Sequence, residues 1–326
     1  MKKICAIALT TLVLGVNSMG ASAAVRMRLA HALAENHPTS QALKLFKEKV
    51  EKDSKGSVKI QLFFNGSLGS EPDVVQQLRN GAVEITKVNA STLENFDPVF
   101  KAFALPFLFT GKDNFYQVME GPIAEGIYSS TKRNGYISLT FYDSGARSFY
   151  TKNKPINTPD DLKGQKLRVM DSQTAIRMVH LMGGIPTPMP YGEIYAALQQ
   201  GVIDGAENNV TALTLGRHGE VTKFYSLDEH SMIPDFLVIS TKAWEKLTPE
   251  QQGILRKAAR ESTAYHKGLW KTAEEDAMKT AVEKMGVTIV RPEKKAFIDK
   301  VKPIYDEYTG DAVIGELVKK IRATQK

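Results

Sequence analysis

The chain is almost free of cysteine. Among 326 residues the one cysteine is Cys5, which lies inside the first hydrophobic segment. Once that segment is removed, no thiol remains to form a disulfide, a thiolate metal site or a cysteine nucleophile. A chain of this length has enough core to fold without disulfides even in an oxidising compartment.

Long hydrophobic runs are also missing after the first residues. The only one, Ile4–Val16, is too short to span a bilayer. It follows Lys2–Lys3 and precedes Ala21–Ala23, an A-x-A pattern typical of a secretory signal peptide. We therefore predict a signal peptide over residues 1–23, with cleavage after Ala23 or, alternatively, after Ala24. The mature chain is expected to be exported and soluble.

Charge of one sign is not concentrated anywhere. The formal net charge is +7, and removal of the two lysines of the signal leaves a mildly positive chain. Basic residues stand close to acidic ones, without a basic stripe that interleaves aromatics, so we expect no nucleic-acid partner. A mildly positive field would attract a small anion, although solubility explains the charge equally well.

Motifs for catalysis are lacking. The sequence has no G-x-G-x-x-G, no G-x-x-x-x-G-K-[ST] and no G-x-S-x-G. Its six histidines include no H-x-x-x-H pair, so a metal site would need distant partners. We expect no cofactor, no metal and no enzymatic activity; a secreted hydrolase or lyase is the alternative from another functional class.

What the sequence does have is an alternation of strand and helix patterns, which predicts layered α/β domains with helices over both sheet faces. The length suggests two domains. The predicted strands cover residues 25–30, 58–64, 84–88, 136–141, 166–169, 185–189, 202–204 and 232–240, and the predicted helices cover 40–52, 71–80, 112–121, 122–133, 173–182 and 193–200.

One predicted helix is unusually long. Thr248–Gln251 forms a capping-box-like start, and helical spacing of apolar residues continues to Met285. A continuous helix over 250–285 would measure about 54 Å, more than one small domain, and would have to lie across both. The alternative is two helices broken near Gly268.

Arginines in two segments are candidates for binding an anion. Arg168 alternates with Leu167 and Val169 in an apolar strand, where burial is costly unless the guanidinium meets an anion. That anion is either a ligand carboxylate, which the guanidinium fork matches, or a protein carboxylate. Arg147 falls where one α/β unit gives way to the next, near a predicted hinge, or else is a solvated loop residue.

Polar residues that follow predicted strands are further candidates, since ligands bind at the carboxyl ends of strands in open α/β sheets. Asn208 and Asn209 would offer amides to hydroxyl or carboxylate oxygens, or cap a helix. His31 and His37 flank the loop after the first strand, where a capping or packing role is the alternative to ligand contact.

Five segments in this order resemble the DctP-type solute-binding proteins of TRAP (tripartite ATP-independent periplasmic) transporters: Phe64–Glu71, Ala104–Phe109, Asp161–Arg168, Pro188–Tyr195 and Gly201–Asn208. The resemblance covers essentially the whole mature chain. It implies a two-domain periplasmic-binding-protein-like fold, with a ligand cleft between the domains and a long helix spanning both. We place domain I at 24–145 plus 234–273 and domain II at 146–233 plus 274–326.

The resemblance also implies roles for individual residues. Arg168 would clamp the ligand carboxylate, and Arg147 and Asn208 would assist. Selectivity would come from the loop after the first strand, where Asn36 and His37 are the candidates, and from the regions around Glu71 and Asn89. Phe107 would line the pocket.

The predicted function is that of a monomeric periplasmic receptor in a Gram-negative bacterium, which captures a small organic acid and delivers it to TRAP membrane subunits. An ABC-type binding protein and a receptor for a sensor kinase are alternatives. Because Glu71 would repel a dianion and accept bonds from hydroxyls, we expect a sugar acid such as a hexuronate ahead of a C4-dicarboxylate or a 2-oxo acid. Alternatively, Glu71 merely caps the helix that it begins.

Overall fold

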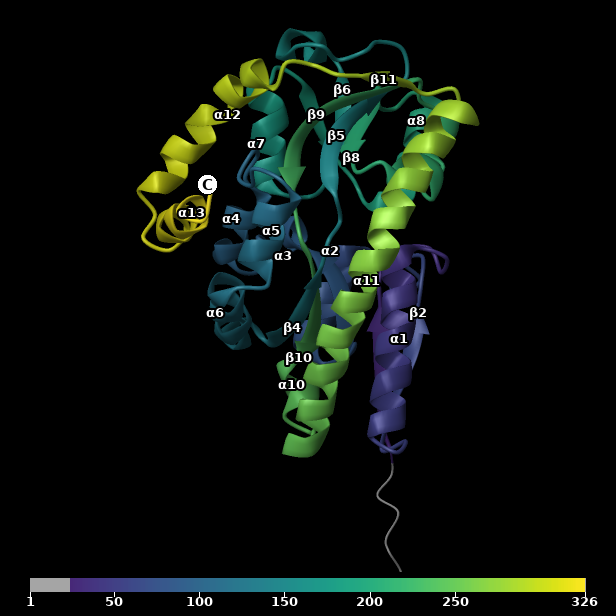
Figure 1. Cartoon of the computed structure of the whole chain (residues 1–326), viewed down its shortest axis with the longest axis vertical. Helices are drawn as coiled ribbons and strands as arrows, with labels where there is room; N and C mark the ends of the chain where they lie inside the picture. The colour runs from purple at the N-terminus through teal and green to yellow at the C-terminus, as the bar shows by residue number, and fades with distance from the viewer. Residues whose placement is uncertain (1–23, 326) are drawn as a thin grey trace, which may run out of the picture.

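The computed structural model describes residues 24–325 and contains two β-sheets covered by helices (Figure 1). The predicted signal peptide and Cys5 lie outside the described residues. No helix in the range 24–325 combines the length and the apolar character needed to cross a membrane.

The first sheet has five strands in the order β2-β1-β3-β10-β4. β1 pairs in parallel with β2 and β3, whereas β10 is antiparallel to β3 and β4. The strands are β1 (Val25–Ala30), β2 (Val58–Phe63), β3 (Ile85–Asn89), β4 (Tyr136–Tyr142) and β10 (Asp235–Ser240). Since β10 runs the opposite way, its first residue Asp235 pairs with Asn89 at the carboxyl end of β3.

The second sheet has six strands in the order β11-β9-β5-β8-β6-β7. β6 is parallel to β7 and β8, and β5 is antiparallel to β8 and β9. The strands are β5 (Ala146–Thr151), β6 (Lys166–Val169), β7 (Ile185–Pro188), β8 (Gly205–Asn208), β9 (Phe224–Met232) and β11 (Thr288–Val290).

The helices cover these sheets. The α-helices are α1 (Pro38–Asp53), α2 (Glu71–Asn80), α3 (Ala90–Leu93), α4 (Lys101–Ala104), α5 (Lys112–Met119), α6 (Pro122–Ser130), α7 (Gln173–Leu181), α8 (Ile194–Gln200), α9 (Thr211–Thr214), α10 (Thr241–Trp244), α11 (Pro249–Glu283), α12 (Lys294–Thr309) and α13 (Ile314–Arg322). The predicted α/β class is confirmed.

The chain passes between the sheets at two neighbouring places. β4 of the first sheet leads through 143–145 into β5 of the second, and β9 of the second leads through 233–234 into β10 of the first. The Ser144 hydroxyl donates a hydrogen bond to the Ile233 carbonyl and so joins the two crossings. The strand predicted over 232–240 is confirmed for 235–240, which form β10, but it starts too early because the chain changes sheets at Ile233–Pro234.

The long helix α11 is continuous and runs beside both sheets (Figure 1). Thr248 and Gln251 form a reciprocal capping box at its start, with Pro249 as the first helical residue. Its first half packs Leu255 with the core of the first sheet, and its second half packs Ala281 with the core of the second. The predicted strut is therefore confirmed, and the break near Gly268 is excluded.

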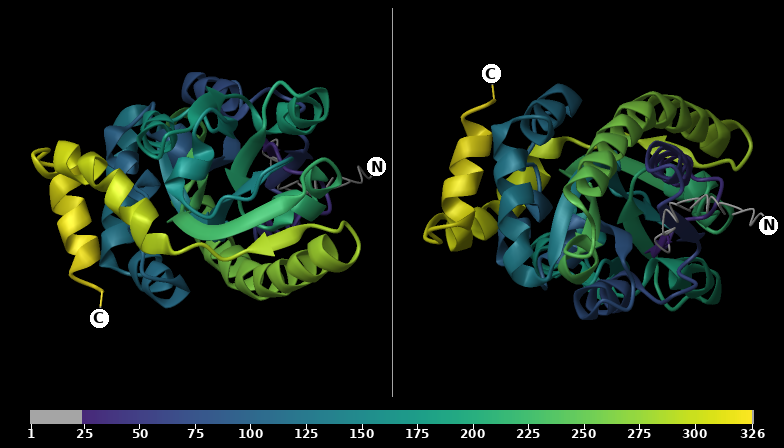
Figure 2. Two further views of the ribbon diagram at one scale, coloured as in Figure 1. Left: turned by 90° about the horizontal axis from the view of Figure 1, so that it is seen from above. Right: turned by 90° about the horizontal axis from the view of Figure 1, so that it is seen from below.

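The two C-terminal helices pack against different parts of the chain. Seen from above and below, α13 lies against helices that precede the first crossing (Figure 2). α12 packs on α7 and β9, but α13 packs on α4 and α6. Its Ile314, Leu317 and Ile321 are buried in the same core cluster as Phe103. Residues 314–322 thus contact the part of the chain assigned to domain I, whereas the sequence placed them in domain II.

Candidate functional site

A cavity of about 770 Å³ is lined by residues from both sheets and from α11. It lies where β3, β6 and β8 end and where β5 and β10 begin, so the edges that gather polar side chains face each other across it. The charged and polar residues of its wall include His37, Glu71, Lys87, Asn89, Thr92, Arg147, Arg168, Tyr191, Asn208, Asn209 and Asp235.

Arg168 presents an unsatisfied guanidinium to this cavity. The residue is 3% exposed and lies on β6, where Nε donates to the carbonyl of Met189 at 3.0 Å. Among residues 24–325, Nη1 has no hydrogen-bond partner and the guanidinium has no carboxylate within salt-bridge distance. Burial lowers the pKa of Arg168, as expected for a cation held without an anion. The alternative of an internal salt bridge is therefore wrong.

Arg147 is buried beside it but is paired with a protein carboxylate. Its Nε and Nη2 make a bidentate contact with Glu207 at 2.6 and 2.9 Å, and Nη1 donates to Oδ1 of Asn208 at 2.8 Å. Burial opposes the charge of Arg147, but Glu207 outweighs it and raises the pKa of the guanidinium. Arg147 is the second residue of β5 and is buried, so it is not a solvated loop residue.

Behind this ion pair stands a second buried cation. His230 contacts Asp228 through Nδ1 at 2.7 Å and Glu207 through Nε2 at 3.3 Å. Burial alone would lower the pKa of His230, but the charges of the two carboxylates raise it to about 9. Burial likewise opposes ionisation of Glu207, yet Arg147 and His230 lower its pKa to about 2. Arg147 is thus fixed in position by a network of charges.

Asn208 is the last residue of β8 rather than the start of a following turn, since that strand spans 205–208 and not the predicted 202–204. Its Oδ1 accepts from Arg147 and from the backbone N–H of Asn209 at 2.9 Å. Oδ1 of Asn209 accepts from the N–H and hydroxyl of Thr211 at 3.0 and 2.6 Å. Both residues line the cavity, and Asn209 orders the turn that follows the strand.

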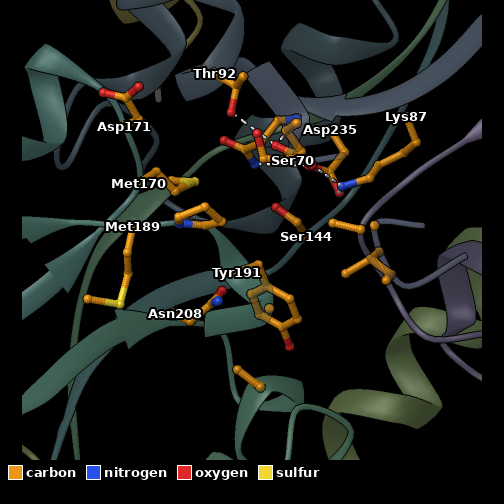
Figure 3. Close-up of a pocket in the computed structure, with 18 of the residues that line it drawn as sticks. Ser70, Lys87, Thr92, Ser144, Met170, Asp171, Met189, Tyr191, Asn208 and Asp235 are labelled. Atoms are coloured by element: carbon orange, nitrogen blue, oxygen red, sulfur yellow. Dashed lines mark hydrogen bonds and ion pairs between the residues drawn. The ribbon is translucent and has the colours of Figure 1, made fainter. Parts of the chain in front are cut away.

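Opposite the arginines, α2 and the first sheet contribute two carboxylates around one buried ammonium, a cluster that we call the acidic pole: Glu71, Lys87 and Asp235. Lys87 Nζ lies 2.9 Å from Oε1 of Glu71 and 3.2 Å from Oδ2 of Asp235. Figure 3 shows Lys87 and Asp235 on one side of the cavity, with Asn208 and Tyr191 on the other.

The acidic pole is held by the ends of β3 and α3. Oε2 of Glu71 accepts from the N–H of Asn89 at 3.3 Å and from the hydroxyl of Thr92 at 3.0 Å, and Asn89 Nδ2 donates to Oδ1 of Asp235 at 2.9 Å. Burial opposes the ionisation of both carboxyls. Lys87 outweighs burial at Glu71 and lowers its pKa, whereas burial and the charge of Glu71 raise the pKa of Asp235.

The helix-cap alternative for Glu71 is not what the structure shows. Ser70 and Asp73 form the capping box of α2, while the Glu71 side chain turns to Lys87. For His37 the capping alternative is confirmed, because Nδ1 accepts from the N–H of Thr39 at 3.2 Å, although His37 also lines the cavity. Asn89 combines the same two positions as the N-cap of α3.

Two predicted residues lie outside the cavity wall. Asn36 is exposed in the turn before α1. Phe107 packs its side chain against the hydrophobic core, and its N–H donates to the carbonyl of His230 at 2.7 Å. Its φ of 54° turns the backbone at that point. The motif shows that an aromatic residue stands at this position, but it does not show whether the ring packs against the core or lines a pocket.

The sequence profile of the DctP family, described as bacterial extracellular solute-binding protein, family 7, matches residues 29–311. The chain belongs to the DctP family. A Salmonella typhimurium relative is 43% identical over 86% of each chain, and a solute-binding protein of Chromohalobacter salexigens is 36% identical over 84% of this chain and 81% of the relative.

Solved TRAP periplasmic solute-binding proteins share this DctP fold closely. One from Chromohalobacter salexigens, with bound D-glucuronate, has a TM-score of 0.89 at 34% identity, covering 92% of this chain and 100% of that one. Another from Bradyrhizobium, in complex with D-galacturonate, has a TM-score of 0.89 at 39% identity, covering 91% and 99%. The resemblance to TRAP solute-binding proteins and the implied fold are thereby confirmed.

The sequence did not single out Lys87, Asp235 or Tyr191 as residues of this DctP-family site. Lys87 stands between Thr86 and Val88 in a buried strand, so the reasoning applied to Arg168 would have found it. Asp235 was hidden because its position depends on β10 joining the first sheet beside β3.

Proposed function

We propose that this protein binds a hexuronate in the cavity and delivers it to the membrane subunits of a TRAP transporter. The observation that carries the proposal is Arg168, a buried guanidinium that lines the cavity with Nη1 unpartnered among the described residues. A ligand carboxylate would supply the missing anion through a bidentate contact. Arg147, occupied by Glu207, would position Asn208 beside that carboxylate.

A sugar acid fits the rest of the wall better than a simple dicarboxylate. The related structures with glucuronate and galacturonate have the same fold over nearly the whole chain. In this chain a second ligand carboxylate would require a second free cation, but Arg147 and Lys87 are each already bound to protein carboxylates. Sugar hydroxyls can instead bond the carboxylate and amide groups that face the cavity.

The proposal includes the setting of the protein. We infer a monomeric receptor in the periplasm of a Gram-negative bacterium, which works by binding and release without catalysis. The matched family is described as bacterial extracellular solute-binding protein, and the solved relatives are described as periplasmic. Ligand-binding residues in this proposal are Arg168, Arg147, Asn208, Glu71, Asn89 and His37.

A side-by-side thermal-shift screen tests the ligand class. D-glucuronate, D-galacturonate, succinate, malate and a 2-oxo acid would each be added to the purified mature protein. A ligand present at a hundredfold excess over its Kd should stabilise the fold by about 2.7 kcal/mol. We expect such a shift with a uronate. A shift with succinate and none with either uronate would overturn the hexuronate assignment and leave the role of Arg168 standing.

A further inference from the structure

The charges of the acidic pole bear on which ligands the cavity accepts, in addition to the binding of a carboxylate by Arg168. Lys87 is 3% exposed and Asp235 is 5% exposed, and the lysine lies between both carboxylates. With all three groups ionised the pole carries one net negative charge. It belongs to the first sheet and α2, whereas Arg168, Arg147 and Asn208 belong to the second sheet. The ligand therefore meets cations on one side and a net negative cluster on the other.

The hydrogen-bonding capacity left at the pole indicates which group it receives. Each carboxylate oxygen has two lone pairs, and the ammonium has three N–H groups. Oε2 of Glu71 accepts twice, Oε1 accepts only from Lys87, and Oδ1 of Asp235 accepts once from Asn89. Oδ2 of Asp235 forms an ion pair with Lys87, which we count as one further contact for each group. Within the described chain, one lone pair on Glu71, two on Asp235 and one N–H of Lys87 are left over.

This surplus of acceptors suits hydroxyl groups. A hydroxyl donates to one carboxylate oxygen and can accept from the remaining N–H of Lys87, so neighbouring hydroxyls of a sugar ring can satisfy the pole. A ligand carboxylate brings only acceptors and a negative charge. Like charges placed together at a buried site cost several kcal/mol. The side of the cavity away from Arg168 is thus built for hydroxyls and against a second carboxylate.

We propose that Glu71, Lys87 and Asp235 are specificity-determining residues that restrict the site to monocarboxylate sugar acids and reject the corresponding hexarates. In a hexarate the hydroxyl-bearing C1 of the uronate is oxidised to a second carboxylate. Lys87 is a positioning residue that holds both protein carboxylates in place. This inference rests on the proposed uronate function and refines it.

Isothermal titration calorimetry of the full mature protein tests the proposal with D-glucuronate, D-galacturonate and their hexarates, D-glucarate and galactarate. We expect the wild type to prefer uronate over hexarate by at least ~100-fold, in line with the cost of facing like charges. Asp235→Asn and Glu71→Gln each remove one negative charge with little change of shape. Each should lower that preference by at least ~10-fold, through tighter hexarate binding.

The matched control is Glu84→Gln. Glu84 directly precedes β3, is paired with Arg28 and lies outside the cavity wall, and the substitution removes the same charge. Its uronate-to-hexarate preference should equal that of the wild type. Because each protein is judged by a ratio for the same two ligands, the ring and open-chain shapes of the ligands cancel between proteins.

The outcomes separate the two levels of the argument. Equal wild-type affinity for uronate and hexarate, or an unchanged preference in whichever of the two pole variants fold, overturns the specificity role while the uronate function stands. A folded wild type that binds neither class overturns the uronate function and this inference together. Thermal melting of each variant identifies any that do not fold.

Discussion

Two buried arginines face the same cavity in opposite electrostatic surroundings. Arg147 is paired with Glu207, whereas Arg168 has only the carbonyl of Met189 as a hydrogen-bond acceptor within residues 24–325. A paired buried charge supports the fold, because its removal strands the partner. An unpaired one contributes little to the stability of the ligand-free fold, which agrees with the ligand-binding role that we propose for Arg168.

Substitution of each arginine by alanine should separate binding from stability. Arg168→Ala should weaken uronate binding by at least ~30-fold, since a ligand carboxylate would be left unpaired. It should leave the free energy of unfolding of the ligand-free protein within about 1 kcal/mol of wild type. Arg147→Ala should instead cost roughly 3–5 kcal/mol of stability, because Glu207 would remain buried without it.

Calorimetry for affinity and urea denaturation for stability would measure both effects. Arg168→Lys serves as a second variant, and it should also bind weakly because lysine has no planar fork. Near-wild-type affinity in a folded Arg168→Ala protein would contradict the role assigned to this residue.

The charge on His230 predicts a loss of stability in alkaline solution. The folded-state pKa is about 9, above the ordinary value of 6.5. The protonated imidazole therefore stabilises the fold fully below pH 6.5, and this contribution is lost as the pH rises through about 9. The loss should amount to at most roughly 3 kcal/mol.

Urea denaturation at closely spaced pH values would follow this loss. A His230→Gln variant has no proton to release, so its stability should vary less over the same interval. Identical pH profiles for wild type and variant would show that His230 is not charged in the native state.

At the scale of the element, two glycines illustrate how position decides the effect of a methyl group. Gly268 lies inside α11, and a Cβ there would meet nothing within 4 Å. Gly145 lies in the first crossing with φ of +72°, and a Cβ there would stand 2.7 Å from Oε1 of Glu274 and 3.2 Å from the Trp270 ring. Gly268 therefore lowers the stability of the helix relative to alanine, whereas Gly145 is required by the left-handed backbone and by the close side chains.

Alanine at these positions should act in opposite directions. Gly268→Ala should raise the free energy of unfolding by about 0.5–1 kcal/mol, because it limits the unfolded chain and favours the helix. Gly145→Ala should lower it by at least about 1 kcal/mol, since the left-handed conformation is strained for alanine. Urea denaturation of both variants gives the sign directly, and a destabilised Gly268→Ala protein would indicate that α11 needs a flexible point.

Elements with a strong local pattern were predictable from the sequence. α11 has a capping box, a first-turn proline and continued helical spacing, so its length was clear. β5 was not predicted as a strand, and the strand predicted over 232–240 ran across the boundary between β9 and β10. Both errors arise because sheet membership depends on partners distant in the chain. The C-terminal helices α12 and α13 also escaped prediction.

The site followed the same rule. Arg168 could be predicted because a cation in an apolar strand is anomalous by itself. The roles of Glu207 and Asp235 could not, since each depends on a contact between segments that the fold alone brings together. Phe107 is the opposite case, because the motif placed its ring in the pocket wall, whereas the ring is partly buried and packs against the hydrophobic core.

At the scale of the whole molecule, the two sheets are joined by the crossings at 143–145 and 233–234 and by α11. Few backbone angles need to change for such lobes to move relative to each other. We expect the ligand to favour a closed arrangement, because it bonds Arg168 in one sheet and the acidic pole in the other. Small-angle X-ray scattering should show a smaller radius of gyration at saturating uronate.

A useful contrast is a carboxylate without hydroxyls, such as acetate, at high concentration. It can occupy Arg168 but cannot reach the acidic pole, so it should leave the scattering profile unchanged. Identical profiles with and without saturating uronate would argue against closure near these crossings.

The chain has two tryptophans, and their positions should allow intrinsic fluorescence to report ligand binding in the cavity. Trp270 projects from α11 into the cavity wall and stacks on His266, whereas Trp244 lies under the guanidinium of Arg256 and away from the wall. Uronate should therefore change the emission of Trp270 alone. Trp244→Phe should keep the ligand-dependent fluorescence signal and Trp270→Phe should lose it, so binding can be followed in real time without any attached dye.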